Sequence, residues 1–294
     1  MIQPNSLQAW GLAIRPKTLT GAAIPVMIGC ALADMYDKLQ VLPAVLCFLF
    51  AFLMQIDANF INDLFDYLKG SDREDRLGPE RACAQGWITV SAMKAGIAVV
   101  TVLAAITGLS LLFFSGWEMI PVGVACIVFA FLYTAGPYPL AYHGWGDVLV
   151  LVFFGFVPVG CTFYVMAHTW TTPVTVASLA CGLIIDTLLM GNNFRDREQD
   201  AMSGKRTLIV CWGARAGLIL YFMLGMVACW CCLYFTSEGK IWAAVLPQLY
   251  LIPHIFTTLK MARINKGKAL NLILGETSRN MLLFGMLLTL GLVL

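Results

Sequence analysis

A series of long apolar stretches constrains this chain most, because each is close to the length that crosses a lipid bilayer, about 20 residues for a helix. Only helices or closed barrels satisfy their backbone in lipid, and these stretches lack the alternating polarity of barrel strands. With 60% hydrophobic and 12% charged residues among 294, the apolar surface exceeds what one soluble core could cover. We therefore predict an all-α integral membrane protein with about nine transmembrane helices. The stretches are 19–33, 41–61, 95–114, 120–135, 147–167, 174–190, 218–235, 241–259 and 281–294.

Basic residues are distributed unevenly between the two sides of such a bundle. If the chain crosses nine times, 17 of its 19 Lys and Arg residues lie in the N-terminal segment and the even-numbered loops, which leaves Lys38 and Lys240 opposite. The positive-inside rule makes the first side cytoplasmic. We expect a multi-pass protein of the cell (inner or plasma) membrane with its polar loops in the cytoplasm. The net charge of +2 does not indicate a nucleic-acid partner, and we expect no protein partner.

Two polar, acidic segments stand at the cytoplasmic ends of apolar stretches. They are 62–66 (NDLFD), followed by Asp72, and 192–196 (NNFRD), followed by Asp200. Carboxylates near the membrane are costly to desolvate and are retained mainly where they pair with a cation or line a wet cavity. Because residues three or four apart share a helix face, each segment can present its oxygen atoms on one stripe. Two matching segments suggest one shared ligand.

The chemistry of these segments favours a hard cation and a phosphate group. Oxygen ligands without neighbouring His or Cys favour Mg²⁺ or Ca²⁺ over zinc. Mg²⁺ is usually held by a few carboxylates plus substrate phosphates, so the many nearby cations indicate a diphosphate between metal and basic side chains. A solvated membrane interface also places acidic and basic residues at helix ends, but the matching order of the two segments favours a site. The nearby cations are Lys69, Arg73, Arg76, Arg81, Lys205 and Arg206.

Further motifs accompany the acidic segments along the chain: 15–19 (RPKTL), 78–82 (GPERA), 86–89 (GWIT), 133–140 (YTAGPYPL), 144–147 (GWGD) and 204–208 (GKRTL). Together and in this order, they closely resemble the UbiA superfamily of intramembrane prenyltransferases. Within it, the chain looks most like the branch that prenylates 1,4-dihydroxy-2-naphthoate in menaquinone synthesis. One departure from the common first motif is Gly70, which stands where an Asp is usual, with the acid at Asp72 instead; this spacing resembles the naphthoate branch.

The resemblance implies an architecture and a reaction. It implies one prenyltransferase domain over residues 1–294, with the helices around a central cavity under a cytoplasmic cap formed by about 62–94 and 192–214. It also implies Mg²⁺ as cofactor. The substrates would be a polyprenyl diphosphate and 1,4-dihydroxy-2-naphthoate, joined with loss of carbon dioxide and release of diphosphate to give demethylmenaquinol.

The resemblance also assigns roles to individual residues. Asp63, Asp66, Asp196 and Asp200 would be catalytic and, with Asp72, would be the metal ligands. The expected substrate-binding residues are polar or basic side chains that we expect to face the same cytoplasmic cavity: Arg15, Asn62, Lys69, Arg76, Arg81, Tyr138, Asp147, Asp186, Asn192, Asn193, Lys205 and Arg206.

Two alternative functions stay open at this point. One is a prenyltransferase of the same superfamily that acts on another aromatic acceptor. The other is a cation transporter that uses its intramembrane carboxylates as a path. The basic residues beside both acidic segments disfavour the transporter, because they would repel a cation.

Overall fold

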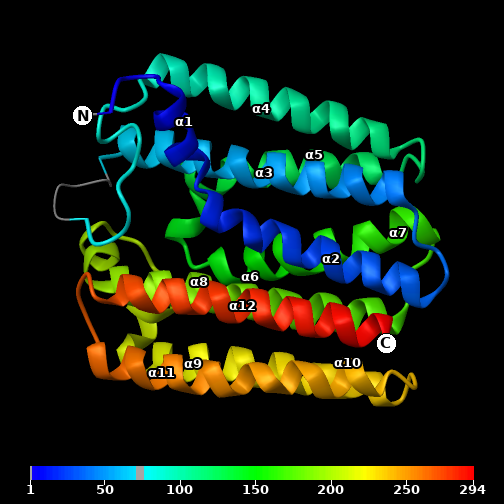
Figure 1. Cartoon of the computed structure of the whole chain (residues 1–294). Helices are drawn as coiled ribbons and strands as arrows, with labels where there is room; N and C mark the ends of the chain where they lie inside the picture. Colours follow the sequence, from blue (N-terminus) through cyan, green and yellow to red (C-terminus); the bar gives the residue numbers. More distant parts are fainter. Residues whose placement is uncertain (1, 71–75) are drawn as a thin grey trace.

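The computed structural model describes residues 2–70 and 76–294, and every regular element in these ranges is helical. The long helices lie side by side, with α3, α4 and α5 on one flank, α9, α10 and α11 on the other, and α2, α8 and α12 between them (Figure 1). The elements are α1 (Leu7–Ile14), η1 (Pro16–Thr18), α2 (Leu19–Met35), α3 (Val41–Leu68), α4 (Val90–Leu111), α5 (Met119–Thr134), η2 (Leu140–Tyr142), α6 (Gly146–Val150), η3 (Leu151–Gly160), α7 (Cys161–Ala167), α8 (Thr172–Met202), α9 (Leu208–Cys232), η4 (Leu233–Thr236), α10 (Ile241–Val245), η5 (Leu246–Tyr250), α11 (Leu251–Ile264) and α12 (Leu270–Val293).

The predicted all-helical, multi-pass membrane architecture is confirmed. In the described part of the chain, seven helical segments are long and apolar enough to cross a membrane. Two further helices are shorter or more polar: α5 has 16 residues, and α12 carries Glu276 and Arg279, which lower its mean hydropathy. The count of nine spans therefore stays a prediction.

The outer surface of the bundle is apolar, as a lipid environment requires. Several large apolar side chains on it are strongly exposed, among them Phe113 at 89%, Val41 at 78% and Ile219 at 63%. An apolar surface of this extent is not typical of a soluble monomer, and it fits contact with lipid tails.

Small residues bring η3 and α8 into backbone contact. A Cβ atom built on Gly155 would lie 2.9 Å from the Cα atom of Gly182 and 2.6 Å from the carbonyl oxygen of Ser178, so no side chain fits there. Small residues at membrane helix interfaces allow such close approach. Because α6 continues directly into η3, α6 also packs against α8.

The ends of α3 and α8 lie at the same end of the bundle as the N-terminus, opposite the C-terminus (Figure 1). The described loops that follow them, 76–89 and 203–207, lie at this end. Side chains from other elements hold the first loop in place: Asn271 of α12 donates to the carbonyl oxygen of Leu77 at 2.8 Å, and the backbone N–H of Thr89 donates to the Asn5 side chain at 3.0 Å. Both acidic segments thus lie beneath the same group of loops.

Candidate functional site

Two cavities meet inside the bundle. A polar cavity of about 580 Å³ lies beneath the loops, and an apolar cavity of about 520 Å³ lies between α2, α3, α4, α5, η3 and α8. Five residues line both cavities and therefore mark their junction: Thr18, Asn62, Tyr133, Leu189 and Asn192. A ligand with a polar head and an apolar tail can occupy both spaces across this junction.

The first acidic segment places two of its residues on the polar cavity. Asp66 is buried, and its Oδ2 atom accepts a hydrogen bond from the Arg81 guanidinium at 2.9 Å. Its Oδ1 atom is also buried and has no hydrogen-bond partner among the described residues. Asn62, one helical turn earlier, accepts a hydrogen bond from the Thr134 hydroxyl. A buried carboxylate oxygen without a partner is costly, so Asp66 is poised for a ligand that supplies positive charge.

Asp63 has a different environment from Asp66. Its side chain does not line the polar cavity. Its Oδ1 atom accepts from the backbone N–H of Cys83 at 2.9 Å, and its Oδ2 atom accepts from the backbone N–H of Ala82 at 3.0 Å and from Arg15 at 3.4 Å. The structure therefore does not bring Asp63 together with the other predicted metal ligands. The Asp63 carboxylate instead fixes the turn that follows Arg81, by accepting hydrogen bonds from its backbone N–H groups.

The second acidic segment lines the polar cavity from α8. Asn192, Asn193, Asp196 and Asp200 all contribute to the wall. Asp196 accepts two parallel hydrogen bonds from its neighbour Arg195, Nε to Oδ1 at 2.7 Å and Nη2 to Oδ2 at 2.5 Å. Such bidentate pairs are strong and fix the geometry of the carboxylate. The second segment therefore presents one carboxylate that is already neutralised.

Asp200 and two lysines also line the polar cavity. Lys205 lies 3.4 Å from Asp200, and the Lys205 and Lys69 ammonium groups lie 4.9 and 5.0 Å from the centre of the Tyr142 ring. Partial burial lowers the pKa of Lys69 in spite of the attraction of Asp66. Burial also acts to lower the pKa of Lys205, but attraction to Asp200 and Asp66 outweighs it and raises that pKa. The carboxylates thus keep Lys205 charged inside the cavity.

Most of the residues predicted from the sequence line this one polar cavity. The exceptions are Asp63, Asp186, Tyr138 and Arg206, and Asp72 lies outside the described residues. The predicted residues that line the cavity are Arg15, Asn62, Asp66, Lys69, Arg76, Arg81, Asp147, Asn192, Asn193, Asp196, Asp200 and Lys205.

Tyr138 and Arg206 lie on the loop surface rather than in the cavity wall. Tyr138 is 55% exposed and stacks on His143, with ring centres 3.5 Å apart. Arg206 is exposed, and its backbone N–H donates to the carbonyl oxygen of Tyr142 at 2.9 Å. The Arg206 contact joins the segment before α9 to η2, and neither the Tyr138 nor the Arg206 side chain lines the polar cavity.

Asp147 and Asp186 form an acidic pair of which only Asp147 reaches the polar cavity. Asp147 lines the polar cavity from α6, whereas Asp186 of α8 is 5% exposed and lies outside both cavity walls. The two carboxyl groups are close enough to interact electrostatically, and each has one oxygen without a hydrogen-bond partner among the described residues. Because Asp186 lines neither cavity, it does not contact a ligand there directly, and any effect of Asp186 on a ligand would act through neighbouring side chains.

Three residues of the site were missed by the sequence analysis as individual candidates. Thr18 and Tyr133 line the junction, and Arg195 clamps Asp196. Each falls within a motif already noted, 15–19, 133–140 or 192–196. The motifs therefore pointed to these positions. The hydroxyls of Thr18 and Tyr133 do not stand out within their motifs as a carboxylate does, and the sequence alone does not show that Arg195 pairs with Asp196.

The carboxylates of the described residues do not by themselves form a closed metal site. Across residues 2–70 and 76–294, no three His, Cys, Asp or Glu side chains lie close enough together to hold a metal ion. The polar cavity instead takes its carboxylates, amide oxygens and cations from several different elements. Such an arrangement is suited to a ligand that itself carries oxygen donors.

Comparison with known proteins assigns the family. A model of the UbiA prenyltransferase family matches residues 22–289, nearly the whole chain. The chain belongs to the UbiA prenyltransferase family. A relative from Haemophilus influenzae named 1,4-dihydroxy-2-naphthoate octaprenyltransferase is 35% identical, over 99% of this chain and 97% of its own. An Escherichia coli protein of the same name is 38% identical over 72% of this chain and 70% of its own.

Solved structures of UbiA homologs share the fold. A homolog from Aeropyrum pernix superposes with a TM-score of 0.69 at 12% identity, covering 93% of this chain and 96% of that one. A homolog from Archaeoglobus fulgidus bound to GPP and Mg²⁺ superposes with a TM-score of 0.68 at 17% identity, covering 97% and 99%. The predicted helical architecture is therefore that of the UbiA family.

Proposed function

We propose that this UbiA-family chain transfers a polyprenyl group from polyprenyl diphosphate to 1,4-dihydroxy-2-naphthoate, with loss of carbon dioxide and release of diphosphate, giving demethylmenaquinol. The observation that carries the proposal is the junction between a polar cavity rich in cations and an apolar cavity. This shape matches a donor with an anionic head and a hydrocarbon tail. The names of the relatives support the choice of acceptor.

The polar cavity supplies the charge that binds the diphosphate. Six basic side chains among the described residues line it, on α8, the loops and the ends of α1 and α3: Arg15, Lys69, Arg76, Arg81, Arg195 and Lys205. Guanidinium groups bind phosphate oxygens through paired hydrogen bonds, and ammonium groups bind them as point charges. Stabilising the charge that develops on the leaving diphosphate is expected to be the largest catalytic contribution of these residues.

The oxygen ligands of the cavity fit Mg²⁺. Asp66, Asp196 and Asp200 would hold it together with amide oxygens of Asn62 and Asn192, and the partnerless Oδ1 atom of Asp66 is the observation that supports the fit. Because the described carboxylates do not close a site alone, the diphosphate would complete the ligand shell, as Mg²⁺ sites commonly require. When bound, Mg²⁺ neutralises charge on the leaving group.

The apolar cavity protects the reacting carbon. The prenyl chain would extend beyond the junction along α5 and η3, where none of the described lining residues is charged. Loss of diphosphate leaves positive charge on the allylic carbon, and exclusion of water prevents its hydrolysis. Phe129, Phe153 and Phe154 line the same space, and their ring faces can stabilise a cation.

The distribution of charge sets the proposed orientation. The loops that carry most Lys and Arg residues close the polar cavity, so we place this end in the cytoplasm of a cell or inner membrane. The chain would form one domain over residues 1–294, capped by about 62–94 and 192–214. Diphosphate, which is soluble, would leave toward the cytoplasm.

The transporter alternative is disfavoured by the cavity walls. A cation path needs polar groups through the membrane, but the apolar cavity beyond the junction has no charged lining residue in the described chain. Basic side chains also surround the carboxylates of the polar cavity. Prenyl transfer explains both observations.

The first test is turnover by purified protein in detergent. We expect diphosphate release when a polyprenyl diphosphate, 1,4-dihydroxy-2-naphthoate and Mg²⁺ are supplied together, with a prenylated product detected by mass spectrometry. No diphosphate release with any aromatic acceptor would contradict the enzyme assignment. Release with 4-hydroxybenzoate but not with the naphthoate would assign another acceptor class.

A second test separates Asp63 from the metal ligands. In Asp63→Asn, one amide N–H group would face a backbone N–H donor or Arg15, so we expect a loss of stability of about 1–3 kcal/mol. We also expect activity to fall much less than in Asp66→Asn, with the Mg²⁺ concentration for half-maximal activity unchanged. Thermal unfolding in detergent and a Mg²⁺ titration of the rate measure both effects. A tenfold higher Mg²⁺ requirement would instead place Asp63 among the ligands.

A further inference from the structure

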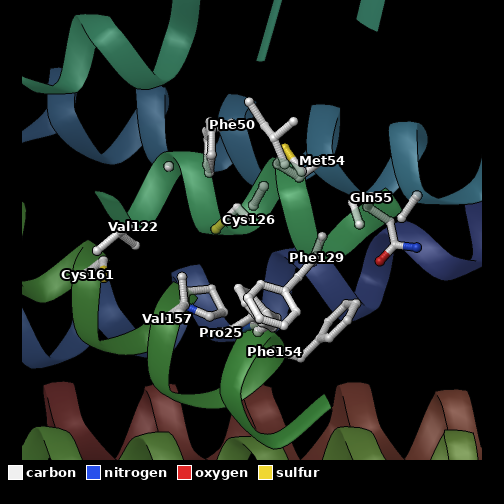
Figure 2. A pocket seen from close by; sticks show the side chains of 18 of the residues that line it. Pro25, Phe50, Met54, Gln55, Val122, Cys126, Phe129, Phe154, Val157 and Cys161 are labelled. Atoms are coloured by element: carbon white, nitrogen blue, oxygen red, sulfur yellow. The ribbon is translucent and has the colours of Figure 1, made fainter. Parts of the chain in front are cut away.

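Gln55 is a polar side chain in the wall of the apolar cavity. It lies on α3, seven residues before Asn62 of the junction, so both residues are on one helix face and about 10 Å apart along the axis. Figure 2 shows its amide among the apolar side chains of the wall, which include Met54, Phe129 and Phe154. An amide at this depth needs a hydrogen-bond partner.

The hydrogen bonds within the protein use only part of the Gln55 amide. Its Nε2 atom donates to the Asn59 side chain at 3.4 Å, which is a long hydrogen bond. Asn59 itself is held by other groups, because its Nδ2 atom donates to the Ile14 carbonyl and the Thr18 hydroxyl, both at 2.9 Å. The carbonyl oxygen of Gln55 has no hydrogen-bond partner in the described part of the chain. It is free to accept a hydrogen bond from a ligand in the cavity.

The proposed acceptor has one hydroxyl that requires such a partner. Its carboxylate is costly to bury and is expected to face the polar cavity. The 1-hydroxyl is next to this carboxylate and can donate to it within the molecule. The 4-hydroxyl is farther from the carboxylate and has no internal partner, so it needs an acceptor atom from the protein once it leaves water. About 10 Å between Asn62 and Gln55 leaves room for one aromatic ring system between the junction and the amide.

We propose that Gln55 is a specificity residue whose amide oxygen accepts a hydrogen bond from the 4-hydroxyl of the aromatic acceptor. The bond orients the ring in the apolar cavity, with its carboxylate-bearing carbon toward the junction. This inference rests on the proposed prenyl transfer to a dihydroxynaphthoate. It goes beyond that function by assigning the acceptor a place in the cavity and a hydrogen-bond partner.

The test compares two ligands that differ only in the 4-hydroxyl. Gln55→Met keeps the side-chain length and removes the acceptor atom. We expect its KM for 1,4-dihydroxy-2-naphthoate to rise about tenfold, the effect of one hydrogen bond. The inhibition constant of 1-hydroxy-2-naphthoate, which lacks the 4-hydroxyl, is expected to stay within about twofold, as is the KM for polyprenyl diphosphate. Leu53→Met, an apolar change on the same helix but outside both cavity walls, is the matched control and should change neither constant.

The outcomes distinguish this inference from the proposed function. If wild-type protein does not prenylate 1,4-dihydroxy-2-naphthoate, the proposed function is wrong and the inference fails with it. If wild-type protein does so, but Gln55→Met weakens both ligands equally or neither, only the inference is wrong. Should Gln55→Met not fold, Gln55→Asn withdraws the amide by one methylene and is expected to shift the same constant in the same direction.

Discussion

Asp66→Asn is expected to lower turnover by about 100- to 1,000-fold or more, while the protein stays folded in detergent. The change replaces a charged oxygen ligand with a neutral amide of the same size. It removes the negative charge that both pairs with Arg81 and offers a partnerless oxygen to the cavity. The rate of diphosphate release at saturating substrate and Mg²⁺ measures the effect.

Asp57→Asn is the matched control for this prediction. Asp57 lies on the same helix and is fully buried, but it lines neither cavity and accepts a hydrogen bond from Thr101 at 2.7 Å. An Asn oxygen can still accept that bond, so we expect activity within a few-fold of wild type. Near-normal turnover in Asp66→Asn would remove this residue from the proposed ligand set. An equal loss in both variants would show a general effect of acidic residues on α3.

Removal of Mg²⁺ is expected to have an effect of similar size. Activity should fall by at least about 100-fold in excess chelator and return when Mg²⁺ is added. Because no three acidic, His or Cys side chains converge among the described residues, the protein alone should bind Mg²⁺ weakly, and a prenyl diphosphate should strengthen the binding. Calorimetric titration of Mg²⁺ with and without a non-hydrolysable prenyl diphosphate measures this coupling.

Two results would contradict this account of the metal. Tight Mg²⁺ binding without the diphosphate would mean that the protein provides a complete site. Full turnover in excess chelator would mean that the basic side chains of the polar cavity suffice to neutralise the leaving group. The second result would leave prenyl transfer in place but assign the charge stabilisation to Arg81, Lys205 and their neighbours.

The two acidic segments show how far helix spacing can identify a site. Spacing of three or four residues groups Asp66 with Asn62 and with Asp63 equally well. In the structure only Asn62 and Asp66 face the cavity, because the loop 76–89 folds over α3 and its backbone N–H groups take both oxygens of Asp63. The helix face that carries these residues could be predicted from the sequence, but the loop that separates Asp63 from Asn62 and Asp66 could not.

Gln55 shows a second limit of the sequence. In a 28-residue apolar helix, one Gln does not reveal whether it faces lipid, a neighbouring helix or a cavity. The approach of α5 and η3 decides this, because they form the opposite wall of the apolar cavity. The sequence analysis therefore did not identify Gln55 as a site residue.

What the sequence determined by itself depends on local properties of the chain. Long apolar stretches predicted a helical membrane protein, and acidic segments flanked by cations predicted a phosphate-binding site, since hydropathy, charge and helix period are set by neighbouring residues. Only the tertiary structure decided which carboxylates share a cavity and that this cavity joins an apolar one. The physical reason is that these features arise from contacts between distant residues, such as Asn271 with Leu77 and Arg15 with Asp63, which no local pattern encodes.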